Sequence, residues 1–339
     1  MASIKMNHSQ LHALCKTFEL GAPLNEPKRV HGGLLHKMWR INTDEASYAV
    51  KQLSPDINVA AESIVKNYNL TEDISARFAH LGIPALSAIK HSGRYLTVIV
   101  NTGYLIYPWV DATALHCDTV SEIHALTIAK ILAKMHRLNI NVPEFEEPVF
   151  DIHPNETILA LIKDSHHCHC PFAEQLDALQ NHILTINTAF QNTLPLLKQH
   201  TVVSHGDLDQ KNVLWDTKGN PIVIDWECAR KLNPTHEIVN AGLDWSGITT
   251  HFDKTLFIKM MQAYQAAGGI LEPALLEAAF NAVLGNWINW MVYNIKRSCL
   301  TQEGEQKTLG IEQVNQVLKI ILTLKNCIPV LMTDLAESV

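Results

Sequence analysis

Three polar side chains near the middle of the chain have the types and spacing that phosphoryl transfer requires. Asp207 lies in a turn, Asn212 comes five residues later, and Asp225 follows an apolar run. A carboxylate such as Asp207 can orient an attacking hydroxyl and accept its proton, whereas oxygen atoms of Asn212 and Asp225 are the hard ligands that Mg²⁺ prefers. The spacing D-x-x-x-x-N is also typical of the catalytic loop of kinases.

A β-hairpin is expected to hold two of these residues together. The apolar segments 213–215 and 222–224 flank a turn at Lys218-Gly219-Asn220, which is a hairpin pattern. Asn212 immediately precedes the first segment and Asp225 follows the second, so we expect both at one end of the hairpin. Either residue alone would more simply belong to a turn or a strand end, but the combination favours the chemical interpretation.

The order of predicted elements divides the chain into a small α/β part and a larger, mainly helical part. In the first part, a helix is expected over about 60–81, and strands over 37–41, 47–53, 86–90, 95–100 and 104–109. Apolar spacing then predicts helices over 121–138, over 157–200 with a break near 166–171, and from about 255 onward. The parts meet near residues 107–115, and we place the domains at 1–108 and 109–339.

Composition excludes several classes of protein. The 339 residues are 47% apolar and 18% charged with a net charge of −7, which argues against a disordered chain and against a nucleic-acid partner. No uninterrupted apolar run of about 18 residues suggests a membrane-spanning helix. The seven dispersed cysteines and the lack of a signal-peptide pattern favour reduced thiols and a cytoplasmic location. We therefore expect neither a nucleic-acid nor a membrane partner.

The segments His205–Trp215 and Ile222–Glu227 resemble the aminoglycoside phosphotransferase and choline kinase group of small-molecule kinases. The pattern H-G-D-x-x-x-x-N followed by [IV]-D-W-E carries the resemblance, which extends over roughly residues 25–300. It implies an α+β, bilobal protein-kinase-like fold with a small β-rich N-terminal lobe and a larger, mainly helical C-terminal lobe. The implied reaction moves the γ-phosphate of ATP or GTP to a hydroxyl of a small molecule and depends on Mg²⁺, with Asp207 as the catalytic base and metal ligands at Asn212 and Asp225.

The resemblance also implies roles for residues earlier in the chain. Gly32 and Gly33 stand where the family places its nucleotide loop, whose backbone N–H groups cover phosphates. Lys51 matches the strand lysine that contacts the α- and β-phosphates. That lysine usually pairs with a helix glutamate, for which Glu72 is our first choice and Glu62 the second.

The same comparison suggests where the purine and the acceptor bind. Tyr107, Trp109 and Val110 fall where the lobes join, and in the family this hinge offers backbone groups to the purine. His136 resembles a structural histidine of the family. The acceptor would be an aminoglycoside, an amino alcohol, a sugar or a related metabolite. Several of these are cations, so three acidic residues are substrate candidates, unless they are merely solvated or capping carboxylates: Asp209, Glu237 and Asp244.

Three other functions stay open as alternatives. A kinase that acts on a protein would have an activation segment closed by A-P-E, and Asp225-Trp226-Glu227 runs on without it. A nucleotide-binding pseudokinase or regulatory protein would lack some of the motif residues, all of which are present. A metal sensor could use the tract His166–Cys170, but its consecutive ligands do not match the usual zinc spacing, so we expect an exposed loop.

Overall fold

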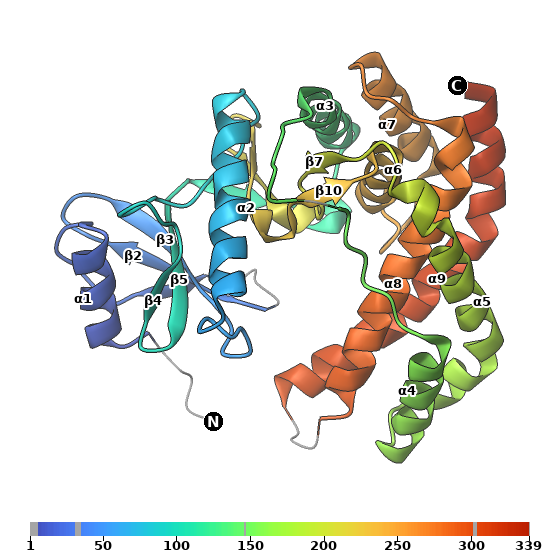
Figure 1. Ribbon diagram of the computed structural model, residues 1–339, viewed down its shortest axis with the longest axis horizontal. Helices are drawn as coiled ribbons and strands as arrows, with labels where there is room; N and C mark the ends of the chain where they lie inside the picture. The colour runs from blue at the N-terminus through green and yellow to red at the C-terminus, as the bar shows by residue number, and fades with distance from the viewer. Residues whose placement is uncertain (1–5, 31–34, 146, 301–303, 339) are drawn as a thin grey trace. The chain divides into compact units, whose positions relative to one another are not determined.

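The computed structural model describes residues 6–30, 35–145, 147–300 and 304–338, which pack as two compact units (Figure 1). The first unit contains the described residues up to Leu115 together with Gln210–Ala229, and the second contains His116–Asp209 and the described residues from Arg230 onward. The predicted boundary after residue 108 follows sequence order alone. It therefore did not anticipate that the chain returns to the first unit at residue 210.

The larger sheet of the first unit is antiparallel, with the strand order β1-β2-β3-β5-β4. The expected strands over 37–41 and 47–53 are confirmed. The predicted strand over 86–90 is wrong, because its backbone bonds to two different partners, Leu86 to Val223 and Ile89 to Ile106, and so joins no continuous ladder. The strands are β1 (Lys28–Val30), β2 (Lys37–Asn42), β3 (Ser47–Gln52), β4 (Thr97–Ile99) and β5 (Thr102–Pro108).

Two helices, α1 (His8–Thr17) and α2 (Glu62–His80), cover opposite faces of this sheet (Figure 1). Successive side chains of a strand point to opposite faces. Accordingly, Ile106 of β5 belongs to the core cluster that contains α1, whereas Leu105 belongs to the cluster that contains Tyr68 of α2. Both faces of β5 are thus buried, which accounts for the unbroken apolar character of this strand.

The second sheet of the first unit contains the predicted hairpin, which is confirmed. Its turn is closed by Asp216, whose Oδ1 accepts from the N–H groups of Lys218 and Asn220 at 2.8 Å. The ring of Phe78 from α2 stacks on Trp226, with centroids 5.4 Å apart, and so links this helix to the segment that follows the hairpin. In the order β6-β8-β9, the strands are β6 (Ala112–Ala114), β8 (Val213–Asp216) and β9 (Pro221–Val223). Two 3₁₀ helices flank the hairpin, η2 (Gln210–Asn212) and η3 (Trp226–Cys228).

The second unit is mainly helical, as expected from apolar spacing. The helix predicted over 121–138 is confirmed, and so is the break near 166–171. Helix α8 packs against both α5 and α9. The helices are α3 (Glu122–Leu138), α4 (Asn155–His167), α5 (Ala173–Leu197), α6 (Pro234–Trp245), α7 (Lys254–Ala266), α8 (Leu276–Ser298) and α9 (Glu305–Ser338). Two strands pair antiparallel, β7 (Val202–Ser204) and β10 (Arg230–Leu232), and two 3₁₀ helices complete the unit, η1 (Cys117–Thr119) and η4 (Pro273–Leu275).

Among the described residues, one helix is long and apolar enough to cross a membrane by length and composition alone, namely α9 over Glu305–Glu337. Such a helix is weak evidence, because core helices of soluble proteins meet the same criteria. Val314, Leu318 and Ile321 of α9 are fully buried, and the helix packs against α8. These contacts make α9 a core element of the second unit.

Candidate active site

Lys51 of β3 lies buried in the first unit between two carboxylates. Its Nζ donates to Asp225 Oδ1 at 2.6 Å and to Glu227 Oε2 at 2.7 Å, and the residue is only 6% exposed. Burial disfavours the charged ammonium, but the two carboxylates more than offset this effect and raise the pKa of Lys51. The lysine is therefore a permanently charged donor in a buried position.

Asn212 and Asp225 lie at the same end of the β8–β9 hairpin, as predicted. The backbone O of Asn212 accepts from the N–H of Ile224 at 2.9 Å, which places it beside the residue that precedes Asp225. Asp225 has φ +63° in the left-handed region, which Asp and Asn tolerate better than most residues. Its side chain is 34% exposed, whereas Asn212 is buried. An amide and a carboxylate on adjoining backbone fit a hard cation such as Mg²⁺ by donor type.

Glu227 is the second carboxylate on Lys51, and a histidine holds it from the other side. His36 Nδ1 accepts from the N–H of Ser54 at 3.0 Å, so its Nε2 carries the proton and donates to Glu227 Oε2 at 3.0 Å. Tyr68 completes the group, with its hydroxyl 3.3 Å from the same Nε2. Burial opposes the charge of Glu227, but the bonds from His36 and Lys51 lower its pKa to about 2.

Sequence reasoning missed both His36 and Glu227 as site residues. Glu227 is part of the D-W-E motif and could have been found there. His36 had no such signal, because it meets Glu227 only through a contact that spans 191 residues of sequence.

Glu72 of α2 has different partners from the one that we predicted. Its Oε1 accepts from the Tyr107 hydroxyl at 2.5 Å and its Oε2 from the N–H of Ala88 at 2.6 Å. Burial raises the pKa of Glu72 to about 7, although these two bonds act in the opposite direction. The helix turns Glu72 inward as expected, but no ion pair joins it to Lys51 in the part of the chain that the structure describes. The expected Lys51–Glu72 pair is thus corrected to Lys51–Glu227.

Three other residues were proposed to bind the nucleotide or to pair with Lys51, and the structure describes only one of them. Gly32 and Gly33 lie outside the described residues. Glu62, the second choice for the helix glutamate, is exposed in the first turn of α2. An exposed carboxylate there is not a partner for Lys51, which is buried in the sheet.

The predicted hinge residues lie at the end of β5 and just beyond it. Tyr107 turns its side chain toward Glu72, as described above. The N–H of Trp109 donates to Ser47 O at 3.1 Å, and the Arg40 guanidinium lies 4.3 Å from the centre of the Trp109 ring. Val110 follows as a half-buried residue. The strand end is thus well anchored, and purine binding there stays a prediction.

Asp207 lies in the second unit, in the turn that follows β7. Gly206 precedes it with φ +80°, a conformation that glycine adopts without a steric penalty. The N–H of Gly206 donates to Glu237 Oε1 at 2.9 Å, and Trp245 Nε1 donates to the carbonyl of Leu208 at 2.8 Å. The backbone on both sides of Asp207 is therefore held by side chains of α6.

Glu237 is one of the predicted substrate residues, but its carboxylate faces the interior. Asn233 accepts from N–H groups of the first turn of α6 and Pro234 follows it, which fixes where this helix begins. Glu237 is only 6% exposed, and its Oε2 lies 2.7 Å from His136 Nε2. Burial opposes its charge, yet the bonds from His136 and Gly206 lower its pKa to about 2. We therefore assign Glu237 to positioning the Asp207 turn.

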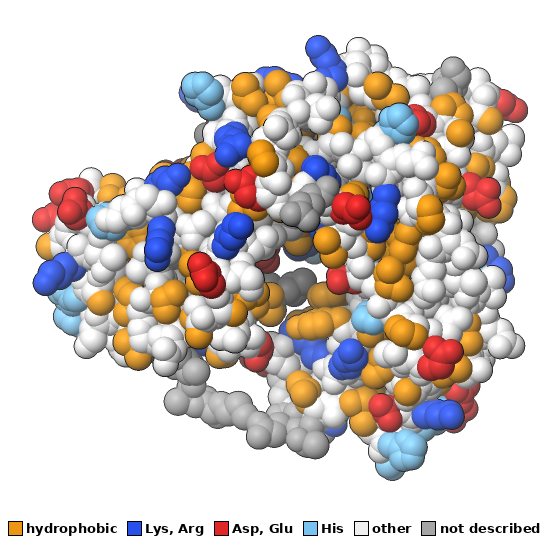
Figure 2. Space-filling view, viewed as in Figure 1, with side chains coloured by type: hydrophobic (Ala, Val, Ile, Leu, Met, Phe, Trp, Pro, Cys, Tyr) orange, Lys and Arg blue, Asp and Glu red, His pale blue; other side chains and the backbone are white. Residues whose placement is uncertain are grey.

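The other two acidic candidates are partly accessible. Asp209 is half-buried, and so is Asp244, whose Oδ2 accepts from Asn240 Nδ2 at 3.1 Å. Figure 2 shows acidic and basic side chains interspersed over the visible face. In that view, the acidic side chains behind the net charge of −7 do not form one patch. Binding of a cationic acceptor would therefore depend on individual acidic residues.

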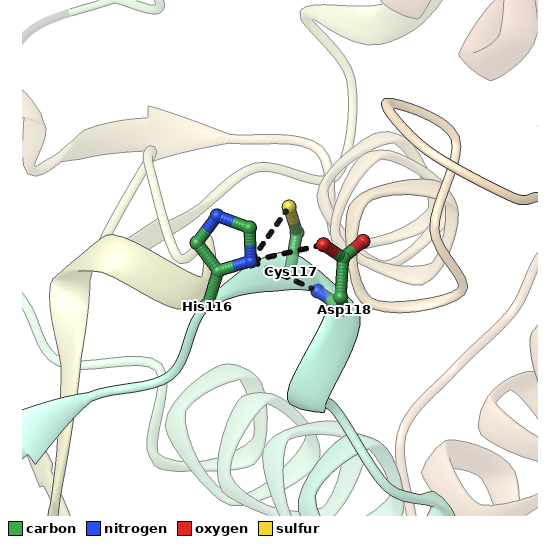
Figure 3. Close-up of side chains that lie close together, drawn as sticks. All are labelled: His116, Cys117 and Asp118. Carbon is green, nitrogen blue, oxygen red and sulfur yellow. Dashed lines mark hydrogen bonds and ion pairs between the residues drawn. The ribbon is translucent and has the colours of Figure 1, made fainter.

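A different group of potential metal ligands lies before α3. His116 Nδ1 is 3.2 Å from Asp118 Oδ2 and 3.8 Å from Cys117 Sγ (Figure 3). These residues are consecutive, His116 and Asp118 are exposed, and their contacts are those of one short turn. Nothing else in the described residues points to a ligand there, and we assign the group no role.

Comparison with known proteins gives the family and the fold. The model of the phosphotransferase enzyme family matches residues 26–277, and no curated protein matches the chain in sequence. The spectinomycin phosphotransferase APH(9)-Ia, in complex with ADP and spectinomycin, superposes with a TM-score of 0.68 at 11% identity, covering 93% of this chain and 98% of that one.

Two further solved structures are similar over nearly the whole chain. The ethanolamine kinase of Plasmodium vivax has a TM-score of 0.60 at 15% identity and covers 93% of this chain and 90% of its own. The choline kinase LicA of Streptococcus pneumoniae has a TM-score of 0.61 at 15% identity, with coverages of 92% and 99%. At such identities the likeness shows the fold alone, and the expected bilobal protein-kinase-like fold is confirmed.

Proposed function

Because the chain belongs to the phosphotransferase enzyme family, we propose that it moves the γ-phosphate of ATP or GTP to a hydroxyl group of a small molecule. The observation that carries this proposal is the buried Lys51, which is paired with the half-buried carboxylates of Asp225 and Glu227. Charged side chains are almost never buried unless they are paired. A buried charge that is held by two carboxylates is typical of a functional site.

The first unit would bind the nucleotide. Lys51 would donate to the α- and β-phosphates, and its raised pKa keeps it charged at any physiological pH. The backbone near Trp109 would meet the purine. That the similar spectinomycin phosphotransferase structure contains ADP supports a nucleotide co-substrate.

The residues Asn212 and Asp225 would hold Mg²⁺, since their oxygen donors suit this ion. When bound, Mg²⁺ would supply charge neutralisation for the transferring phosphoryl group. The protein's own part is to fix the two ligands, which the β8–β9 hairpin does through the bond from Ile224 to Asn212.

The second unit would bind the acceptor. Asp207 would orient the acceptor hydroxyl and take up its proton, with its turn held by Glu237. Asp209 and Asp244 are the remaining candidates for contacts to a cationic acceptor. The acceptors named for the similar structures, spectinomycin, ethanolamine and choline, are all amines or ammonium ions, which supports an aminoglycoside or amino alcohol ahead of a neutral sugar.

A coupled assay of nucleotide consumption tests this proposal. Hydroxylated amines, aminoglycosides and sugars are screened with ATP and with GTP, and the product is checked for a new phosphate ester by mass spectrometry. Asp207→Asn and Asp225→Asn should each lower kcat by about a hundredfold or more, whereas Asp151→Asn, an exposed aspartate of the second unit, should retain full turnover. Unchanged turnover in Asp207→Asn, or slow hydrolysis with no acceptor phosphorylated, would overturn the proposal.

A further inference from the structure

Glu72 is buried where three segments of the first unit meet. Its Oε1 accepts from the Tyr107 hydroxyl at 2.5 Å, near the end of β5, and its Oε2 accepts from the N–H of Ala88 at 2.6 Å. The residue itself belongs to α2 and is only 3% exposed. One carboxylate therefore joins the helix, the segment 86–89 and the strand. These bonds take the place of the ion pair to Lys51 that was expected of this glutamate.

The segment 86–89 covers the part of β5 that extends past β4. Strand β4 pairs with residues 102–104 of β5. Farther along β5, the N–H of Ile89 donates to Ile106 O at 2.6 Å. The Glu72 carboxylate lies beside this bond, because it holds the residue before Ile89 and the residue after Ile106. A side chain thus strengthens the edge of the sheet at the place where a strand was predicted.

The same edge of β5 contains backbone that the purine is proposed to meet. Backbone groups of successive residues in a strand point to alternate edges. The N–H of Trp109 donates toward β3 at 3.1 Å, whereas Ile106 O faces the opposite edge, where it accepts from the segment 86–89. Pro108 comes two residues after Ile106, so its carbonyl oxygen faces that edge as well. The residue between them is Tyr107, whose side chain is bonded to Glu72.

Tyr107 also lies on the same face of the sheet as Lys51. In the register of β3 and β5, Lys51 is opposite Leu105 and Ala49 is opposite Tyr107. Residues opposite each other point to one face, and so do residues two apart in a strand. The bond between Tyr107 and Glu72 is therefore made on the face that contains the proposed phosphate-binding lysine.

We propose that Glu72 and Tyr107 are a positioning pair for the nucleotide, an inference that rests on the proposed function. The carboxylate fixes the residue between Ile106 and Pro108. It thereby holds the strand edge at which the Pro108 carbonyl would meet the purine. Because this contact concerns the purine end of the nucleotide, loss of the pair should weaken nucleotide binding and leave kcat at saturating nucleotide nearly unchanged.

Binding of a non-hydrolysable nucleotide analogue tests the pair without an acceptor. Isothermal titration calorimetry with AMP-PNP and with GMP-PNP, each with Mg²⁺, is run above the pKa of about 7 to which burial raises Glu72. Tyr107→Phe removes only the hydroxyl and should weaken binding by about tenfold, the effect of one hydrogen bond to a charged group. Tyr95→Phe removes a hydroxyl from the same core cluster and should bind as the wild type does.

Two substitutions of Glu72 separate its hydrogen bonds from its volume. Glu72→Gln keeps an oxygen that accepts from the N–H of Ala88 and gains an amide that can donate to the Tyr107 oxygen. It should therefore lose less affinity than Tyr107→Phe. Glu72→Met fills a similar space without these groups, and it should lose at least as much affinity as Tyr107→Phe.

Hydrogen–deuterium exchange reports on the strand edge itself. If the pair holds this edge, its loss should speed exchange of the Ile89 N–H, because local opening becomes easier. A peptide that spans residues 84–90 should show faster exchange in Tyr107→Phe and in Glu72→Met. The same peptide in Tyr95→Phe should exchange as it does in the wild type.

Three results would overturn the positioning pair. Unchanged affinity in Tyr107→Phe, in a protein whose wild type binds an analogue, would remove the pair but leave the proposed function standing. Equal losses in Glu72→Gln and Glu72→Met would show that the charge acts, and not the two hydrogen bonds. A wild type that binds neither analogue would contradict the proposed function, and this inference with it. Far-ultraviolet circular dichroism checks folding, and Tyr107→Phe, which lacks one hydroxyl, keeps the test decisive if Glu72→Met does not fold.

Discussion

Lys51 Nζ lies 2.7 Å from Glu227 Oε2, so the buried lysine takes one counterion from the segment after β9 and not from α2. The expected partner, Glu72, is engaged by Tyr107 and Ala88. One short segment therefore supplies both the proposed metal ligand Asp225 and the residue that orients the proposed phosphate-binding lysine. A substitution in this segment should therefore affect metal binding and the orientation of Lys51 together.

Substitution of Glu227 tests this arrangement. Glu227→Gln keeps the shape but removes the charge that orients Lys51, so kcat/KM for the nucleotide should fall by about tenfold or more, equivalent to ~1.4 kcal/mol. Glu72→Gln leaves both ion pairs of Lys51 in place and should cause the smaller loss. Steady-state kinetics with varied nucleotide measures both variants. A larger loss in Glu72→Gln than in Glu227→Gln would restore Glu72 as the partner.

His36 should act through Glu227 alone. Its Nε2 donates to Glu227 Oε2 at 3.0 Å, so His36→Ala should lower kcat/KM in the same direction as Glu227→Gln but by less. The effects of substituting two residues of one hydrogen-bond network do not simply add. The double variant should therefore be no worse than Glu227→Gln by more than about threefold, and fully additive losses would show that His36 acts separately.

Glu237 should influence turnover through the Asp207 turn. Glu237→Gln weakens the contacts to His136 and Gly206, and loss of a partner by a buried polar group costs about 1–3 kcal/mol of stability. We expect lower kcat with little change in KM for the nucleotide, together with a lower urea-unfolding midpoint. Glu277→Gln, at an exposed position of α8, is the matched control. A change in stability with kcat intact would mean that Glu237 serves folding only.

His236 should make the protein less stable in mild acid. Burial, assisted by Arg230, lowers its pKa to about 4 from an ordinary value of 6.5. Below pH 6.5 the unfolded chain binds a proton that the folded chain excludes, so stability falls by about 1.4 kcal/mol per pH unit until about pH 4. Glu72, whose pKa is raised to about 7, has the opposite effect over the same pH range in every variant. Urea unfolding should therefore show the His236 loss as a difference between the wild type and His236→Gln, and the exposed-histidine control His251→Gln should behave as the wild type does.

His236→Gln should lack that part of the acid dependence, because glutamine does not titrate. Parallel pH profiles for His236→Gln and the wild type would contradict the assignment of the loss to this histidine.

Elements built from near neighbours could be predicted from the residues alone. The β8–β9 hairpin has two apolar runs on either side of a Gly turn, so the common position of Asn212 and Asp225 followed from local pairing. Apolar spacing over residues 60–81 likewise predicted the helix α2, on which Glu72 lies. The strand predicted over 86–90 failed because strand formation depends on a continuous partner, and this segment is shared between two strands.

The partners of the buried charges were decided only when the chain had folded. Lys51 meets Asp225 and Glu227 across 174 and 176 residues, and Cys170 meets Cys299 across 129. Contacts of this kind depend on how sheets and helices pack, for which spacing along one segment carries no information. The motifs thus indicated the proposed chemistry, whereas tertiary packing selected Glu227 over Glu72, turned Glu237 toward the Asp207 turn, and brought Cys299 next to Cys170.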